Sequence, residues 1–386
     1  MLFRPQASYR MVIMARCSFD DIRIAGCALV TGEHESRIDD CPEYYNNDPA
    51  FLARLKKTIG FGTRRAAADA TTTADLCRRA SESLLQSLRV APSSVDAVVS
   101  VTQTPDYPMP GNAHVLHAAL GLPEAAAALD VELGCSGYVY GLWLSFMMAS
   151  AGLDRVLLVA GDTLSKRANR QDRTLAPLFG DAGSATLIER CDGAPRSFFI
   201  LRSDGAGLEK MYVEAGGARH PSTPETRRER NVEEGCIRSR EDLYMDGFGI
   251  FEFTMGRQPG LLRDILAYAG QTVADIDYFV LHQANRYIVE TITRKAGIPA
   301  EKAPSQGFPL FGNQNSASIP GVLCGLLAGE LAGRSARTVL QGYGVGLSWG
   351  ACLVQLDHVP CLPPVAYDAA CGGERPDKGA AKPEGA

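Results

Sequence analysis

The feature that most constrains the fold of this chain is an alternation of apolar strand-like runs with helix-like segments, which occurs twice in the same order. In the first series we expect strands at 22–30, 96–102, 126–133, 155–161 and 184–189, and helices at 74–88, 113–120 and 138–152. In the second series we expect strands at 198–202, 276–282, 338–342 and 348–356, and helices at 260–269, 286–296 and 316–331. Strands that alternate with helices predict an α/β fold in which helices cover a mostly parallel sheet.

Two pairs of strand segments indicate that the two series arose by duplication. Residues 95–99 resemble 276–280, and residues 155–158 resemble 337–340, with offsets of 181 and 182 positions. A nearly constant offset of about half the chain is what a duplicated α/β unit leaves in a sequence. We therefore expect an N-terminal half at 21–195 and a C-terminal half at 196–358 that face each other.

Three further segments differ in composition from these halves. Residues 1–20 show no sustained apolar run and are expected to be a disordered extension. Residues 218–242 are rich in Arg, Glu and Pro, so we expect a solvated excursion from the core. Residues 359–386, rich in Pro, Gly, Ala and Lys, are expected to be a disordered tail.

Composition and charge argue against several classes of function. The 386 residues are 46% hydrophobic, which is ordinary for a globular protein and sufficient for two cores. A net charge of -5, with arginines scattered among acids, gives no reason to expect nucleic acid as a partner. The longest apolar stretch, at 138–153, is shorter than the roughly 20 residues that span a bilayer. We therefore expect a cytoplasmic protein without membrane insertion.

The eleven cysteines are an odd number and are widely spread, which disfavours a disulfide framework. No CxxC or HExxH motif occurs, and no group of histidines has convincing metal-ligand spacing. We therefore expect neither a structural disulfide network nor a bound metal.

Cys135 is the strongest candidate for a chemical role. It follows a strand-like run, lies in the Gly-Cys-Ser-Gly motif at 134–137 and precedes the expected helix at 138–152. Free N–H groups and the positive end of the helix dipole favour a thiolate, and can lower a cysteine pKa from about 8.5 to roughly 3.5–7.5. The sequence therefore predicts a nucleophilic sulfur.

Two polar groups in the second series complement this sulfur. His282 follows the expected strand at 276–282, and Asn313 lies in a Gly- and Asn-rich loop before another helix. Parallel sheets place ligands at the carboxyl edge of their strands, so we expect all three residues at one edge. Imidazole and carboxamide N–H groups can stabilise an oxyanion beside an acylated thiol. The N–H groups of Gly344, Val345 and Gly346 are expected to complete an oxyanion hole with that of Cys135.

Five motifs in a fixed order closely resemble those of the β-ketoacyl-acyl-carrier-protein synthase III group of the thiolase superfamily. They are Gly-Cys-Ser-Gly at 134–137, Phe-Gly-Asp-Ala-Gly-Ser-Ala at 179–185, His-Gln-Ala-Asn at 282–285, Gly-Asn at 312–313 with Ser-Ala-Ser-Ile-Pro at 316–320, and Gly-Val-Gly-Leu-Ser-Trp-Gly at 344–350. The resemblance extends from about residue 22 to residue 356. It implies a duplicated thiolase-like fold with five layers, αβαβα, and a homodimer.

The resemblance also implies a ping-pong reaction. Cys135 would accept an acyl group from an acyl-CoA, and His282 and Asn313 would bind the thioester carbonyl of a malonyl unit on acyl carrier protein. Loss of carbon dioxide would leave an enolate that attacks the acyl group. CoA and carrier phosphopantetheine thioesters would be substrates, and no cofactor is implied. His282 would have to be a neutral donor, which a desolvated site favours.

Three positions are assigned to substrate binding by the same resemblance. Phe51 takes the place of a tryptophan that stacks on the CoA adenine, and Arg173 matches an arginine near the CoA phosphates. Met109 replaces a phenylalanine that closes the acyl pocket from the partner subunit, and a longer, more flexible side chain there favours a primer other than acetyl.

Two other functions remain open from the sequence. The same scaffold could transfer the acyl group from Cys135 to an alcohol or amine without decarboxylation, although an intact asparagine argues mildly against this. A non-catalytic subunit that pairs with an active homologue would be expected to have lost part of the triad, whereas all three residues are present. The sequence specifies neither the acyl chain length nor the carrier protein nor the pathway.

Overall fold

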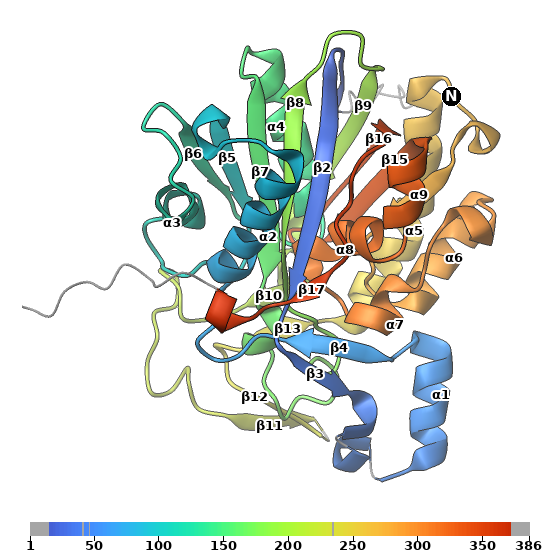
Figure 1. Ribbon diagram of the computed structural model, residues 1–386. Coiled ribbons are helices and arrows are strands. Elements are labelled where there is room, and N and C mark those ends of the chain that lie inside the picture. The colour runs from blue at the N-terminus through green and yellow to red at the C-terminus, as the bar shows by residue number, and fades with distance from the viewer. Residues whose placement is uncertain (1–14, 41, 46, 234, 372–386) are drawn as a thin grey trace, which may run out of the picture.

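The computed structural model describes residues 15–40, 42–45, 47–233 and 235–371, which contain two mixed β-sheets and three layers of helices (Figure 1). The first sheet has the order β17-β2-β8-β7-β5-β6, and the second has the order β1-β9-β16-β15-β14. The strands of the first sheet are β2 (Ile22–Thr31), β5 (Ala97–Val101), β6 (Ala127–Val131), β7 (Arg155–Asp162), β8 (Ala182–Arg190) and β17 (Val365–Ala366). Those of the second are β1 (Ala15–Phe19), β9 (Ser197–Ser203), β14 (Tyr278–Leu281), β15 (Ser335–Gly344) and β16 (Ser348–Asp357).

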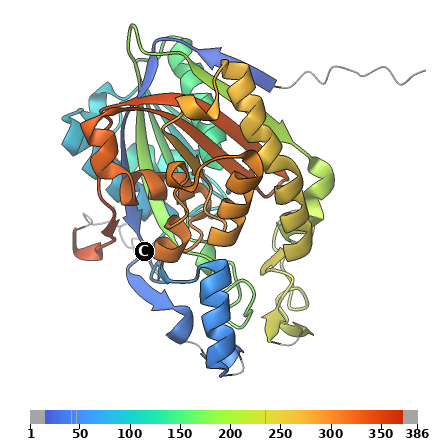
Figure 2. The ribbon, with the colours of Figure 1, turned by 90° about the vertical axis from the view of Figure 1, so that its right-hand side faces the viewer.

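The helices form one layer between the sheets and one outside each sheet, which gives the expected five-layered αβαβα fold (Figure 1). Helices α2 (Thr73–Leu88) and α3 (Asn112–Ala119) pack on the outer face of the first sheet. Helices α4 (Gly137–Ser150) and α8 (Ser318–Gly325) lie between the sheets in the largest apolar cluster. Helices α5 (Gly247–Ala269) and α6 (Arg286–Ala296) cover the outer face of the second sheet, in front of it in Figure 2.

The pairing pattern of the strands confirms the duplication. In the first sheet, β2–β8 and β8–β7 are antiparallel and β7–β5 is parallel. In the second, β9–β16 and β16–β15 are antiparallel and β15–β14 is parallel. The pair Ala97–Val156 of the first sheet corresponds to the pair Tyr278–Thr338 of the second, at offsets of 181 and 182 positions.

The expected disordered extension at 1–20 is wrong in its last residues. Strand β1 pairs antiparallel with β9 along its whole length, from Ala15 opposite Leu201 to Phe19 opposite Ser197. Residues 1–14 lie outside the described residues. An N-terminal segment therefore completes the second sheet rather than the first.

The expected disordered tail at 359–386 is wrong for residues 359–371. Strand β17 pairs in parallel with β2, and Cys361 forms a bridge with Cys27. The physical reason is burial, because Val359, Cys361 and Tyr367 each keep less than a tenth of their surface exposed. Residues outside the two expected halves at 21–195 and 196–358 thus complete the sheets, β1 the second sheet and β17 the first, and residues 372–386 lie outside the described part.

Smaller elements gather at the lower end of Figure 1. They are β3 (His34–Arg37), β4 (Thr63–Ala66), α1 (Pro49–Ile59), β10 (Met211–Val213), β11 (Arg230–Glu233), β12 (Cys236–Arg238) and β13 (Leu243–Met245). The polar excursion at 218–242 contains β11 and β12 and is largely exposed, as expected, although Cys236 is buried. Two short helices, α7 (Gly307–Phe311) and α9 (Ala328–Gly333), lie on either side of α8 in the sequence.

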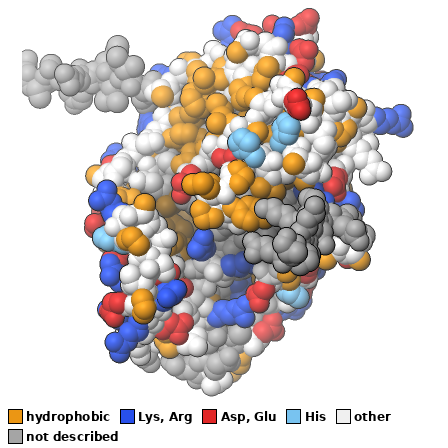
Figure 3. All heavy atoms as spheres, turned by 90° about the vertical axis from the view of Figure 1, so that its left-hand side faces the viewer, with side chains coloured by type: hydrophobic (Ala, Val, Ile, Leu, Met, Phe, Trp, Pro, Cys, Tyr) orange, Lys and Arg blue, Asp and Glu red, His pale blue; other side chains and the backbone are white. Residues whose placement is uncertain are grey.

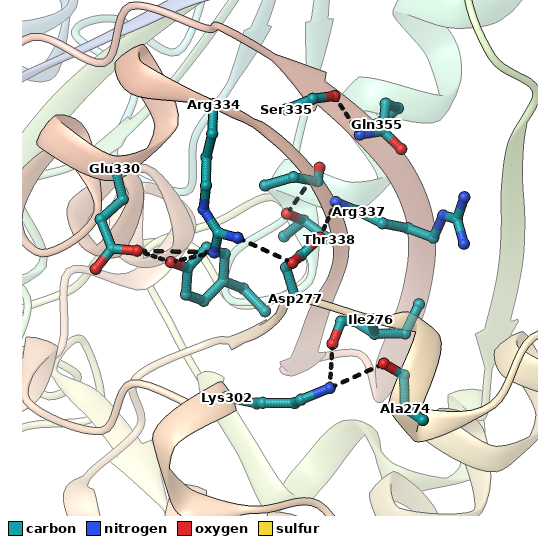
Figure 4. A network of polar contacts seen from close by, with 12 residues as sticks. Ala274, Ile276, Asp277, Lys302, Glu330, Arg334, Ser335, Arg337, Thr338 and Gln355 are labelled. Carbon is teal, nitrogen blue, oxygen red and sulfur yellow. Dashed lines mark hydrogen bonds and ion pairs between the residues drawn. The ribbon is translucent and has the colours of Figure 1, made fainter.

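A polar network fixes the start of β14 against β15 (Figure 4). Asp277 accepts hydrogen bonds from the Arg337 backbone N–H at 2.7 Å and from the Arg334 guanidinium at 3.1 Å. The Lys302 ammonium donates to three backbone carbonyls just before this strand, with the shortest contact at 2.6 Å to Ile276. Strand β14 is thereby held at one end, and His282 follows its other end. Within the described residues, no helix has both the length and the apolar character needed to cross a bilayer.

Candidate active site

The structure brings Cys135, His282 and Asn313 to the same edge of the two sheets. Cys135 lies just before Ser136, the N-cap of α4, and His282 directly follows β14. Asn313 follows α7 and Gly312, which adopts a left-handed conformation with φ of 73°. The three residues are 6%, 1% and 8% exposed, so the site is buried. One residue, Asn315, contacts the other groups and links them.

The Cys135 sulfur is a neutral hydrogen-bond donor in this structure. Its Sγ donates to Asn315 Oδ1 at 2.9 Å. Burial, and then the charge of Asp162, raise the pKa of the thiol to about 12, against smaller lowering contributions from the backbone of Cys135 and Val345. The predicted lowering of this pKa by the helix N-terminus is therefore wrong for the free protein, because desolvation outweighs it.

Asn315 and Asp162 are site residues that the sequence reasoning missed. Asn315 Nδ2 donates to Asp162 Oδ2 at 3.0 Å, and both residues are 1% exposed. Burial raises the pKa of Asp162 to about 6, although several hydrogen bonds oppose this. Asp162 ends the apolar strand β7, and a carboxylate at the end of a buried strand was the available signal.

His282 is a neutral imidazole, as expected. Burial lowers its pKa to about 3, and the Asn315 backbone opposes this shift only partly. The Tyr343 hydroxyl donates to the His282 carbonyl at 3.0 Å, and the two rings pack edge to face at 5.3 Å. The buried Nδ1 of His282 has no hydrogen-bond partner among the described residues. This side chain therefore retains unused hydrogen-bonding capacity, which buried groups seldom do.

Asn313 is held by its backbone and by its side-chain oxygen. Its N–H donates to the Leu178 carbonyl at 2.8 Å, and its carbonyl accepts from the Gly180 N–H at 3.1 Å. The Asn313 Oδ1 accepts from the Asn315 N–H at 3.0 Å. This bond turns the amide Nδ2 away from the Asn315 N–H and leaves it as a donor for a ligand.

The loop between β15 and β16 lies against the sulfur. A Cβ placed on Gly344 would be 2.8 Å from Cys135 Sγ, so only glycine fits at this position. The Val345 backbone is close enough to lower the pKa of the Cys135 thiol. The Val345 carbonyl accepts from the Ser348 hydroxyl at 2.7 Å, and Gly346 precedes a cis peptide bond to Leu347. Of the four predicted oxyanion-hole residues, Cys135 and Val345 therefore direct their backbone toward the sulfur.

Phe51 and Arg173 line the same cavity, of about 560 Å³, which we call the Phe51 cavity. Leu178 also lines it, and the Leu178 carbonyl accepts a hydrogen bond from the Asn313 N–H. The Arg173 guanidinium makes no hydrogen bond or ion pair with any described residue. The Arg54 guanidinium lies 5.2 Å from the centre of the Phe51 ring, so one face of that ring is already covered.

A second cavity of about 560 Å³, the Val345 cavity, begins at the loop beside the sulfur. It is lined by Leu133, Leu164, Met211, Val345 and Gly346, and also by the polar residues Gln103, Glu132, Arg167 and Glu241. Met109 is not part of either cavity. Its side chain is 83% exposed, at a cis peptide bond to Pro110, so within one chain it does not approach the triad.

Comparison with known proteins gives consistent similarities. A family model described as 3-oxoacyl-[acyl-carrier-protein] synthase III matches residues 129–207, which include Cys135. A model of the C-terminal part of the same synthase matches residues 266–356, which include His282 and Asn313. Together the two matches cover both sides of the candidate site.

Individual relatives cover most of the chain. A β-ketoacyl-[acyl-carrier-protein] synthase III of Symbiobacterium thermophilum is 34% identical, over 77% of this chain and 87% of its own length. A synthase III of Streptomyces coelicolor is 34% identical over the same shares. The crystal structure of a 3-oxoacyl-(acyl-carrier protein) synthase from Burkholderia xenovorans superimposes with a TM-score of 0.85 at 35% identity, over 92% of this chain and 99% of that one.

Proposed function

This chain belongs to the 3-oxoacyl-[acyl-carrier-protein] synthase III family of thiolase-fold condensing enzymes, and from this we propose that it condenses an acyl-CoA primer with malonyl carrier protein. The observation that carries the proposal is the arrangement around Asn315. This residue contacts Cys135 through its side chain and Asn313 through its backbone, and its backbone also acts on the His282 ring.

The first half-reaction forms an acyl-enzyme. The Cys135 sulfur attacks the thioester carbonyl of the acyl-CoA, a new C–S bond forms, and the CoA sulfur leaves with the proton that Cys135 gives up. The N–H groups of Cys135 and Val345 stabilise the oxyanion of the tetrahedral intermediate. The Phe51 cavity receives CoA, and the Arg173 guanidinium, which pairs with none of the described residues, is available to its phosphates.

The second half-reaction uses the other two members of the triad. The neutral His282 and the Asn313 amide donate hydrogen bonds to the thioester carbonyl of the malonyl unit. The malonyl carboxylate leaves as carbon dioxide, and its C–C bonding pair becomes the enolate. The enolate carbon then attacks the acyl carbonyl, a C–C bond forms, and the Cys135 sulfur is expelled as a thiolate that takes up one proton from solvent. A neutral histidine suits this role, because burial lowers the pKa of His282 to about 3 and a neutral imidazole still carries one N–H donor.

We propose that the acyl chain extends into the Val345 cavity. This cavity begins beside the sulfur, and apolar Leu164 and Met211 form part of its wall. Because Glu132 and Arg167 also line it, primers with polar substituents belong in the substrate panel together with acetyl and longer apolar chains.

The proposed functional unit is a homodimer built on β6, the edge strand of the first sheet. Leu129 on this strand is 42% exposed, and Tyr107, Met109 and Met147 are also exposed large hydrophobic residues. Figure 3 faces this end of the molecule and shows hydrophobic side chains gathered over it. Pairing of two β6 edges would cover these groups and bring Met109 of one subunit toward the other.

The experiment that tests the function has two steps. Purified protein is incubated with a panel of acyl-CoAs, and peptide mass spectrometry locates the adduct; malonyl carrier protein is then added and the product is identified by mass. We expect an acyl adduct on Cys135 that converts into a β-ketoacyl carrier protein. The relatives favour neither alternative function. An acyltransferase to an alcohol or amine would transfer the acyl group without a β-ketoacyl product. A non-catalytic pairing subunit would form no adduct.

A further inference from the structure

Asn315 lies between the nucleophilic sulfur and a buried carboxylate. Its Oδ1 accepts from Cys135 Sγ at 2.9 Å, and its Nδ2 donates to Asp162 Oδ2 at 3.0 Å. A backbone φ of 49° places Asn315 in the left-handed region, where asparagine is among the few tolerated side chains. The residue thus adopts an unusual backbone conformation that places its amide between these two groups.

The orientation of this amide follows from chemistry alone. An ionised carboxylate can only accept hydrogen bonds, so the NH₂ end of Asn315 must face Asp162 and the oxygen must face Cys135. Gln103 Oε1, at 3.5 Å from the same Nδ2, is also an acceptor and favours the same orientation. Asp162 itself is fixed by donors on both carboxylate oxygens. They are Thr102 Oγ1, Gln103 N and Thr104 Oγ1 on Oδ1, and Ser316 N and Ser316 Oγ on Oδ2.

We propose that Asp162 and Asn315 are positioning residues that keep the resting Cys135 sulfur protonated and hold it in place beside the Val345 cavity. An oxygen acceptor at 2.9 Å is matched to a thiol but opposes a thiolate, since two acceptors would then face each other. The carboxylate behind the amide adds a like charge, which also opposes ionisation. The free enzyme thereby holds a protected nucleophile, and its S–H proton remains available for the CoA sulfur that leaves.

This inference rests on the proposed role of Cys135 as acyl acceptor, but its test uses the free enzyme and needs no substrate. Tyr343 and His282 are two other titratable groups near the sulfur. The pKa of Tyr343 is raised, first by burial and then by the Cys135 charge, and His282 is neutral. Neither changes its charge between pH 5 and 9, so the ionisation of Cys135 in this range reports on Asn315 and Asp162.

The experiment measures the rate of Cys135 alkylation by iodoacetamide as a function of pH, with peptide mass spectrometry to separate Cys135 from the other cysteines. Two variants change the group that faces the Cys135 sulfur. Asn315→Gly removes the acceptor and tolerates the left-handed backbone, and Asp162→Asn lets the Asn315 amide turn its NH₂ end toward the sulfur. Thr102→Val is the matched control, because it removes a donor to Asp162 Oδ1 and leaves the Oδ2 contact with Asn315 intact.

We expect the wild-type and Thr102→Val rates to rise up to pH 9 without a plateau. In Asn315→Gly and Asp162→Asn the profile should shift down by at least about one pH unit, which is at least about tenfold faster alkylation at pH 7. Wild-type pH profiles in both variants would overturn the inference, as would an equal shift in Thr102→Val. If the alkylation profile shifts in both variants but acyl-CoA does not acylate the wild-type protein, the role of the Asn315 amide is supported and the proposed function is rejected.

Discussion

Gly344 lies so close to Cys135 that a single added carbon would occupy the space of the sulfur. A Cβ on Gly344 would be 2.7 Å from Cys135 Cβ and 2.8 Å from its Sγ. The loop that carries Val345 and the turn before α4 that carries Cys135 come from opposite halves of the chain, so this contact shows how closely the two halves pack at the site.

This contact makes Gly344→Ala a sharp steric probe. We expect it to displace the sulfur, to reduce acylation by at least about tenfold, and to cost about 1–3 kcal/mol of stability through overpacking. The matched control is Gly329→Ala in α9, where no atom lies within 4 Å of the added carbon. Initial rates of acyl-CoA consumption and thermal unfolding check both variants; normal acylation by Gly344→Ala would mean that the sulfur does not react from this position.

Single replacements of the triad residues should distinguish acyl-enzyme formation from condensation. Cys135→Ala should abolish acyl-enzyme formation, whereas His282→Ala and Asn313→Ala should still form it but lose condensation. Removal of one oxyanion donor in an active site typically costs about 10²–10³ in rate. Intact-mass analysis after acyl-CoA, followed by product analysis after malonyl carrier protein, distinguishes the two steps. Condensation at the normal rate in either variant would show that its assigned role is wrong.

His282 should remain uncharged across the working pH range. Burial lowers its pKa to about 3, so the imidazolium forms only below that pH and no titration occurs near the ordinary value of 6.5. Nuclear magnetic resonance of protein with ¹⁵N-labelled histidine should show neutral-ring shifts for His282 from pH 5 to 9, with the signal assigned by its absence in His282→Ala. A titration between pH 6 and 7 would be inconsistent with a neutral donor.

Asp162 should make the protein less stable as the pH rises through its titration. Burial raises its folded pKa to about 6 from an ordinary 3.8, so the folded state binds the proton more tightly than the unfolded state. The protonated Asp162 therefore adds about 3 kcal/mol to the free energy of unfolding below pH 4. This stabilisation falls between about pH 4 and 6 and is absent at higher pH. Urea unfolding of wild type and Asp162→Asn at several pH values tests this, and a stability difference that is flat across this range would refute it.

The β6 edge should govern the oligomeric state. Leu129→Lys places a charge on this strand and should convert a dimer into a monomer. Leu310→Lys, an equally exposed leucine on α7, should leave the dimer intact. Light scattering coupled to size-exclusion chromatography measures the molar mass of both variants and of the wild type. A monomeric wild type or a dimeric Leu129→Lys would rule out this interface.

Much of the fold could be predicted because local signals agreed with tertiary packing. Helix α6 was predicted with its bounds, since Asn285 caps its start and Gly297 ends it. Helix α5 was expected only from residue 260, yet it begins at Gly247 and continues through Pro259, despite the low helix propensity of its glycines and proline. The burial of Phe253 and its neighbours on the second sheet outweighs those local preferences.

Other features depended on contacts that no local pattern reveals. The expected helix at 316–331 is divided into α8 and α9 near Leu326. Strands β1 and β17 are short and pair with partners at least 178 positions away. Cys135, His282 and Asn313 were identified by their motifs, but the partners that set the state of the sulfur were not. The pKa of Cys135 was predicted in the wrong direction, because the helix N-terminus was considered without the burial and the Asp162 charge around it.

We propose that one buried site joins an acylated Cys135 to a decarboxylating malonyl unit. The most direct measurement is the release of labelled carbon dioxide from malonyl carrier protein by the isolated acyl-enzyme, with the product counted in parallel. We expect one carbon dioxide for each β-ketoacyl carrier protein formed, and no β-ketoacyl carrier protein from Cys135→Ala. Loss of the acyl group to an alcohol or amine without carbon dioxide would contradict it.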